Sequence, residues 1–182
     1  MDDDFPRLVS LACHDLRTPL ATVSGFAKTM LRIEELEPDK QARYLGLIDN
    51  SAEELASLLD LLSLAARIEG GRYEPVLREV DSLSLAPEGA TGTGATVLVD
   101  PEPVDRALAA FQRAAARHGG VDVAVAVDGP AVSFEPVTEE AAPVVLGDSA
   151  KDLGAAVAAR LVRSLGGGLA LDGERLTVTL PS

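Results

Sequence analysis

A seven-residue recurrence of apolar side chains dominates the first part of the chain. Two interleaved series make up this pattern: Val9, Leu16, Val23 and Met30, with Ala12, Leu20, Ala27 and Ile33 between them. Apolar residues at this spacing lie on one side of an α-helix and pack against other helices. Residues 6–33 are therefore predicted to form a long helix with one apolar seam.

A second apolar seam follows after a break at residues 34–39. Pro38 cannot continue a helix, and the charged residues around it suit solvent, so a turn is predicted there. The apolar positions of the second helix are Leu45, Ile48, Ala52, Leu55, Leu59, Leu62 and Ala66. Gly70 and Gly71 predict its end.

The two predicted helices form a hairpin, which we assign to a first domain of residues 1–71. Each helix would have about 28 residues and a length of about 42 Å, and a lone hairpin of that size cannot bury a two-sided seam. We therefore expect a homodimer in which two hairpins form a four-helix bundle. The alternative is that the helices pack against the C-terminal half of the same chain.

Residues 72–182 have the pattern of short strands alternating with helices, and we assign them to a second domain. Strands are predicted at 73–85, 95–99, 121–127 and 131–134, with a turn at 89–94. Helices are predicted at 101–117, with Asp100 as its cap, and at 151–165, before a hairpin of 169–171 and 176–180. The predicted fold class is α+β, a long helical hairpin followed by a small α/β sandwich.

The composition excludes several classes of function. A net charge of −13 opposes binding to nucleic acid, and 3% aromatic residues without tryptophan leave little for base stacking. Cys13 is the only cysteine, so neither an intrachain disulfide nor a zinc site of several thiolates can form. There is no run of about 18 apolar residues, and the acidic start does not resemble a signal peptide. We expect a cytoplasmic protein without a nucleic-acid or membrane partner.

The segment His14-Asp15-Leu16-Arg17-Thr18-Pro19-Leu20 lies on the first predicted helix and carries the chemistry. A neutral imidazole can accept a phosphoryl group on nitrogen near neutral pH and pass it on, because its unperturbed pKa is close to that pH. Asp15 lies about 100° around the helix from His14, so it can help only through its reach or a local distortion. Pro19 cannot donate to the carbonyl of Asp15, and a bend is predicted just past His14.

A stripe of small and polar residues runs along the helix face that carries His14. It consists of His14, Thr18, Ala21, Gly25 and Lys28. Such a face can admit a partner surface, and the Thr18 hydroxyl, one turn from His14, could orient a water or a phosphoryl oxygen. The alternative is an ordinary solvated face.

The segment His14 to Leu20 resembles the H-box of sensor histidine kinases, and its position on a helical hairpin is similar to their dimerisation and phosphotransfer domain. The C-terminal half resembles their ATP-binding domain in the order of its elements. Residues 100–119 resemble the N-box helix, and residues 153–180 resemble the closing helix and hairpin.

Three departures from that family affect nucleotide binding. The N-box asparagines that hold phosphates and Mg²⁺ in the family correspond here to Ala110 and Ala114, and a methyl group cannot coordinate Mg²⁺. The DxGxG adenine box is replaced by residues 133–137, and the later glycine box survives only as residues 152–156. The resemblance therefore implies a degenerate ATP-binding domain that binds no nucleotide cofactor and does not phosphorylate itself.

What remains resembles the kinase-derived histidine phosphotransferases of bacterial phosphorelays. The resemblance implies that His14 accepts the phosphoryl group, that Asp15 is its polar or general-base neighbour, and that Thr18 assists dephosphorylation. The partners would be response-regulator receiver domains, which supply their own Mg²⁺. The residues expected to contact a receiver are Arg17, Ala21, Ser24, Gly25 and Lys28. The alternatives are a non-catalytic adapter that binds a regulator or kinase, and a divergent sensor histidine kinase.

Two further residues invite a functional interpretation. Cys13 is adjacent to His14, but consecutive helix residues diverge, and no metal site is predicted there. His118 precedes two glycines at a helix end, where a cation interacts favourably with the helix dipole, so it is expected to act as a cap.

Overall fold

The computed structural model describes residues 4–33, 36–149 and 151–182. It divides into two compact units, Met1–Ser63 and Leu64–Ser182. The predicted acidic start at residues 1–3 lies outside the described residues. The boundary between these units lies between residues 63 and 64, before the predicted boundary between residues 71 and 72. The reason is that Leu64 and Ile68 pack against the core of the second unit.

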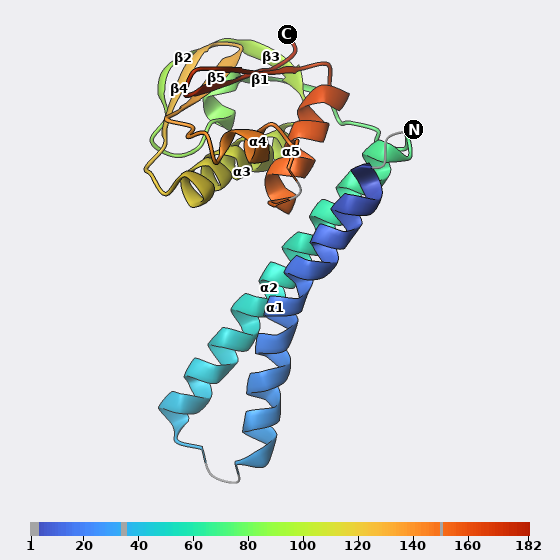
Figure 1. Ribbon diagram of the computed structural model, residues 1–182, viewed down its shortest axis with the longest axis vertical. Coiled ribbons are helices and arrows are strands. Elements are labelled where there is room, and N and C mark those ends of the chain that lie inside the picture. The colour runs from blue at the N-terminus through green and yellow to red at the C-terminus, as the bar shows by residue number, and fades with distance from the viewer. Residues whose placement is uncertain (1–3, 34–35, 150) are drawn as a thin grey trace. The chain divides into compact units, whose positions relative to one another are not determined.

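Helices α1 (Asp4–Arg32) and α2 (Pro38–Glu69) form the predicted hairpin and lie side by side in Figure 1. Pro38 occupies the first position of α2, where a proline loses no helical hydrogen bond. Near the connection the rings of Phe26 and Tyr44 lie 5.0 Å apart between centroids. The two helices and the hairpin predicted from the apolar seams are thus confirmed.

A single hairpin leaves part of its apolar seams uncovered. Ala12 is fully buried, whereas Leu20 and Leu59 each remain 54% exposed and Leu45 remains 50% exposed. These large apolar side chains recur at helical spacing and are about half exposed. Such a pattern is expected of a helix face that packs against another molecule. The four-helix bundle of a homodimer stays a prediction.

The second unit contains two small sheets. Strands β1 (Arg78–Asp81) and β3 (Thr96–Val99) pair antiparallel, with Glu79 opposite Leu98. The larger sheet has the order β2-β4-β5-β7-β6 and is mixed, because β2 runs parallel to β4 and the other pairs are antiparallel. Its strands are β2 (Thr91–Gly94), β4 (Ala124–Gly129), β5 (Ala131–Glu135), β6 (Gly168–Asp172) and β7 (Arg175–Thr179).

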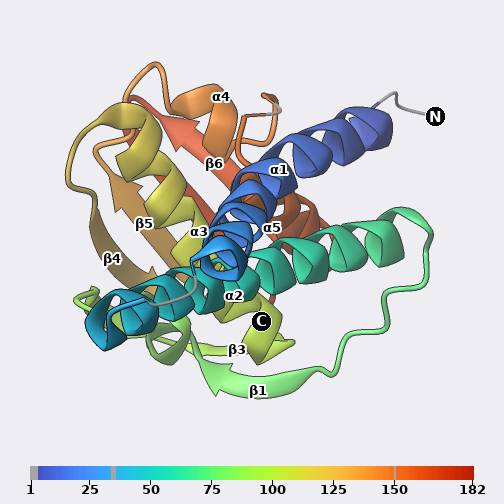
Figure 2. The same ribbon diagram turned by 90° about the horizontal axis from the view of Figure 1, so that it is seen from below.

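Three helices cover one face of the larger sheet. They are α3 (Pro101–Gly119), the short α4 (Ala142–Val145) and α5 (Leu153–Ser164). Figure 1 shows them on one side of the strands, and Figure 2 shows the same layer from below. This arrangement confirms the predicted α/β sandwich with a mixed sheet, and so the α+β class of the chain.

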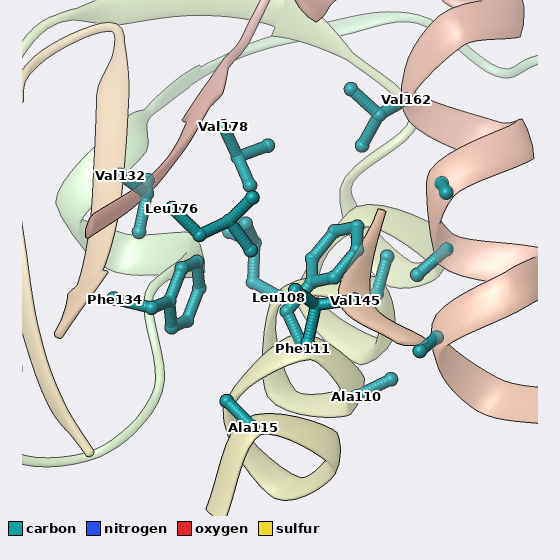
Figure 3. Close-up of a cluster of buried hydrophobic side chains, with 14 of the residues drawn as sticks. Leu108, Ala110, Phe111, Ala115, Val132, Phe134, Val145, Val162, Leu176 and Val178 are labelled. Carbon is teal, nitrogen blue, oxygen red and sulfur yellow. The ribbon is translucent and has the colours of Figure 1, made fainter. Parts of the chain in front are cut away.

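The core of the second unit lies between the helices and the larger sheet. Figure 3 shows Phe111 and Leu108 of α3 facing Leu176 and Val178 of β7, with Phe134 of β5 beside them. The rings of Phe111 and Phe134 lie 6.1 Å apart in a tilted arrangement. Alternation within each strand produces this core, since the inward-facing side chains Val125 and Val127 of β4 are buried and their neighbours are exposed.

Two predicted segments differ in the structure, and α4 is a helix that the sequence pattern does not predict. Of residues 73–85, only Arg78–Asp81 forms a strand, and a 3₁₀ helix, η1 (Ser82–Leu85), follows because the Asp81 carboxylate accepts the Leu83 amide at 2.8 Å. The predicted turn at 89–94 contains strand β2. Glycine makes this pairing possible, because a Cβ at Gly92 would collide with the carbonyl oxygen of Val127 on β4.

Candidate phospho-acceptor site

His14 and Asp15 form a polar pair on the surface of α1. Imidazole Nδ1 of His14 lies 3.1 Å from Oδ1 of Asp15, although consecutive helix residues point in different directions. The His14 side chain is 78% exposed, and that of Asp15 is 30% exposed. The reach of the Asp15 side chain is therefore enough to bring its carboxylate to the imidazole.

This geometry can orient the imidazole ring. A hydrogen bond to one ring nitrogen determines where the proton of a neutral imidazole resides. In the tautomer that carries its proton on Nδ1, the Asp15 carboxylate accepts this hydrogen bond and the lone pair resides on Nε2 of an exposed ring. An imidazole in this form can act as a nucleophile toward an incoming electrophile.

The other predicted site residues lie along the same helix. Arg17, Thr18, Ala21, Gly25 and Lys28 are exposed, and Ser24 is half-buried. The positions of Thr18, Ala21, Gly25 and Lys28 place them within about 40° of the direction of His14 around the helix axis. The Thr18 carbonyl accepts the Thr22 hydroxyl at 3.2 Å, and the Gly25 carbonyl accepts the Thr29 hydroxyl at 2.8 Å. The docking role of this surface stays a prediction.

Pro19 lies within α1, and the helix continues through it from Asp4 to Arg32. Its side chain is buried, whereas the neighbouring residues Thr18 and Leu20 are exposed. The ring therefore packs inward, while the stripe of His14, Thr18, Ala21, Gly25 and Lys28 faces solvent. The bend predicted just past His14 stays a prediction.

Ala110 and Ala114, which the resemblance aligns with the N-box asparagines, lie in the core of the second unit. Ala110 is 5% exposed and Ala114 is fully buried, and both lie in α3 among apolar neighbours. A Cβ added to Gly154 at the start of α5 would lie 3.4 Å from the Cβ of Ala110, so the two helices approach closely there. These methyl groups contribute packing and no ligand oxygen.

Residues 152–156, which resemble part of a glycine box, include the cap of α5. Asp152 precedes α5, and its Oδ1 accepts the backbone amide of Ala155 at 3.0 Å. Its Oδ2 lies 3.5 Å from Nε2 of His118 and 3.7 Å from Nη1 of Arg117. Within residues 133–137, Phe134 and Val137 are buried in the core.

Of the two capping predictions, that for Asp100 is confirmed in position and that for His118 is wrong. Asp100 occupies the N-cap position of α3 but makes no side-chain cap bond, and its Oδ2 accepts the Tyr73 hydroxyl and the Val76 amide instead. At the other end of α3 the Gly120 amide donates to the Ala116 carbonyl at 2.8 Å with Gly120 at a φ of 65°, while His118 turns a buried Nε2 toward Asp152. Long-range partners decide both positions.

No group of three or more His, Cys, Asp or Glu side chains that could hold a metal ion occurs in the part of the chain that the structure describes. Cys13 is exposed. Over the same residues, no helix combines the length and the apolar character that a bilayer crossing requires.

Residues 7–71 match the family profile described as the His Kinase A (phospho-acceptor) domain. The match covers the hairpin and includes His14. An uncharacterized sensor-like histidine kinase of Rhizobium meliloti is 35% identical over 78 residues, which cover 42% of this chain and 15% of that protein. The sensor protein kinase PmrB of Pseudomonas aeruginosa is 35% identical over 80 residues, covering 44% of this chain and 16% of that protein. The chain thus matches only a small part of the length of these relatives.

A solved structure of the Acinetobacter baumannii histidine kinase AdeS is similar over 92% of this chain and 97% of that chain, with a TM-score of 0.63 and 16% sequence identity. At this identity the likeness shows the fold alone, a helical hairpin followed by an α/β unit. The sequence matches themselves concern the hairpin, where residues 7–71 are similar to the phospho-acceptor domain of histidine kinases.

Proposed function

We propose that this chain is a histidine phosphotransferase of a bacterial two-component phosphorelay, and that it moves a phosphoryl group between receiver-domain aspartates through His14. The observation that carries the proposal is the exposed His14 imidazole held through Nδ1 by Asp15 on a hairpin that matches the His Kinase A family. Both the oriented lone pair and the access of a partner protein follow from this geometry.

The transfer consists of two displacements at phosphorus. Nε2 of His14 attacks the phosphorus of a receiver aspartyl phosphate, the bond from phosphorus to the aspartyl oxygen breaks, and the aspartate carboxylate leaves. The ring now carries the phosphoryl group on Nε2, and Asp15 interacts with the positive charge that develops at Nδ1–H. In the second displacement a carboxylate oxygen of another receiver attacks, and the electron pair returns to Nε2. Mg²⁺ is expected in the receiver, where it would neutralise charge on the phosphoryl oxygens.

The stripe around His14 suits the approach of a receiver. Arg17 and Lys28 are exposed cations, while Ala21 and Gly25 present little side-chain bulk. An acidic receiver pocket would be attracted to such cations, and small side chains permit close approach of its backbone. Thr18 lies one turn from His14 and is the residue proposed to orient water during dephosphorylation of a receiver. The chain would act as a homodimer and, as we further propose, in the cytoplasm.

The proposal includes the loss of ATP binding. Its support is the burial of Ala110 and Ala114 and the use of Asp152 as the cap of α5. A nucleotide with Mg²⁺ needs oxygen or amide ligands where this chain places methyl groups in contact with other apolar side chains.

A divergent sensor histidine kinase is the second candidate. The observation in its favour is that the relatives that match the hairpin are described as sensor kinases, and that the likeness to AdeS extends over both units. An adapter that binds a regulator or kinase without carrying phosphate is a third candidate. It would use the same exposed stripe without chemistry at His14.

One experiment separates these candidates. The purified chain is incubated either with a ³²P-phosphorylated receiver domain or with labelled ATP and Mg²⁺, and acid-labile label on the chain is measured. We expect the chain to acquire label from the receiver and none from ATP. The label acquired from the receiver should be lost in His14→Ala and retained in His118→Ala. Label from ATP would establish a kinase. Receiver binding without label, unaffected by His14→Ala, would establish an adapter.

A further inference from the structure

The end of α2 and the segment that follows it each make a polar contact with a part of the second unit that is distant in the chain. We propose that residues 64–77, the last turns of α2 and the segment after them, form a latch. The latch contacts α5 and the start of α3, so that these segments unfold and refold locally as one cooperative unit. This inference concerns the coupling of the phospho-acceptor hairpin to the α/β unit. Only the role of the latch in signalling rests on the proposed function.

The first contact is an ion pair between α5 and α2. Arg160 is only 9% exposed, and its Nε donates to Oε1 of Glu69 at 2.9 Å. Its Nη1 also donates to the Ala156 carbonyl at 2.9 Å, within α5. A buried guanidinium requires an opposite charge and hydrogen-bond acceptors, so the helical position of Glu69 at the end of α2 is tied to the packing of α5.

The second contact joins the segment that follows α2 to the start of α3. The Tyr73 hydroxyl donates to Oδ2 of Asp100 at 2.9 Å, and the Val76 amide donates to the same oxygen at 3.2 Å. Burial, together with the Asp100 carboxylate, holds the pKa of Tyr73 above its usual value. Arg67, in the last turn of α2, lies with its guanidinium 5.5 Å from the centre of the Tyr73 ring.

Apolar packing completes the latch. Leu64, Ile68 and Tyr73 are partly buried against the core of the second unit. Arg67, which lies over the Tyr73 ring, and Glu69, which pairs with Arg160, lie between these residues in the sequence. The same two turns of α2 therefore supply apolar and polar contacts to one unit, and displacing them breaks both kinds at once.

The latch has a consequence for signalling. Helix α2 runs without interruption from Pro38 to Glu69, so its last turns belong to the helix that pairs with the His14-bearing α1 and also to the fold of the α/β unit. A change that unwinds or shifts the end of α2 is therefore expected to disturb α5 through the Glu69–Arg160 pair and the start of α3 through the Tyr73–Asp100 hydrogen bond.

Native-state amide hydrogen exchange of the full chain, measured at increasing urea below the unfolding transition, tests the latch. Residues that open in one unit share a common opening free energy and a common urea dependence. We expect residues 66–69 to share both with residues 157–161 of α5. Glu69→Gln should make exchange faster by at least tenfold in both segments, and Arg160→Gln should act on the same two segments.

A double-mutant cycle separates coupling from simple loss of stability. If Glu69 and Arg160 act through each other, the effects of Glu69→Gln and Arg160→Gln on exchange are not additive in the double variant. Glu102→Gln is the matched control, since it removes the carboxylate of the exposed Glu102–Arg106 pair on α3. We expect it to leave exchange in both segments unchanged. The proposal would be overturned if the amides of residues 66–69 shared their opening free energy with the rest of α2 and Glu69→Gln left exchange in α5 unchanged. This outcome does not depend on whether His14 carries phosphate.

Discussion

His14 and Asp15 are consecutive on α1, yet the imidazole Nδ1 and a carboxylate oxygen lie 3.1 Å apart at the surface. The pair combines an exposed imidazole ring with a carboxylate that orients it.

Asp15→Asn should lower the rate of phosphoryl transfer through His14 by about 100-fold, the scale of a lost general-base or orienting group. The amide keeps the size of the side chain but cannot stabilise the developing imidazolium. Rapid-quench transfer from a ³²P-labelled receiver measures the rate. Asp49→Asn, at an exposed position of α2, is the control, and an Asp15→Asn rate equal to that of the natural protein would disprove the role of this carboxylate.

Leu59→Glu should shift the protein from dimer to monomer. Leu59 is 54% exposed on the hairpin, and a charge there would have to be buried at the predicted interface. Sedimentation equilibrium measures the mass. Leu98→Glu, at a 43% exposed position of β3, should leave the mass unchanged. A monomeric natural protein at micromolar concentration would refute the bundle.

Ala114→Asn should lower the free energy of unfolding by about 1–3 kcal/mol, because it forces a larger polar side chain into a filled core. Ala114 is fully buried, so an asparagine there has no room to serve as a nucleotide ligand. Urea unfolding provides the measurement, with Arg113→Asn on the exposed face of α3 as the control. If Ala114→Asn were tolerated and gave Mg²⁺-ATP binding, the proposal of a closed site would fail.

Gly92→Ala should destabilise the sheet edge by about 1–3 kcal/mol. Gly92 has a φ of 122°, and its new Cβ would collide with the carbonyl of Val127. Gly168→Ala in β6 is the matched control, because its Cβ would only touch Thr179 at 4.0 Å. Thermal unfolding of both variants tests this, and equal midpoints would contradict the close approach of β2 to β4.

The sequence predicts best the elements whose pattern is local. The seven-residue seams predict α1 and α2, and alternation around residues 172–175 predicts the final hairpin, because side-chain periodicity is set by the element itself. The position of His14 on an exposed helix face follows from the same periodicity.

Elements held by distant partners escape such prediction. Residues 91–94 have the composition of a turn and become a strand only through pairing with β4. Residues 142–145 are too short to show a period, and α4 is missed. Asp100 occupies the predicted N-cap position of α3, but the hydrogen bond of its side chain to Tyr73, like the approach of His118 to Asp152, depends on residues elsewhere in the chain.

The contact between Glu69 and Arg160 also bears on how the molecule can be divided. The glycines at residues 70 and 71 are the natural place for a cut, and an α/β fragment that starts there would lose Leu64, Ile68 and the Glu69 carboxylate. Such a fragment would expose apolar core and remove a counter-charge from α5. A fragment suitable for crystallisation or ligand screening therefore has to begin at or before residue 64 and carry the last turns of α2 with it.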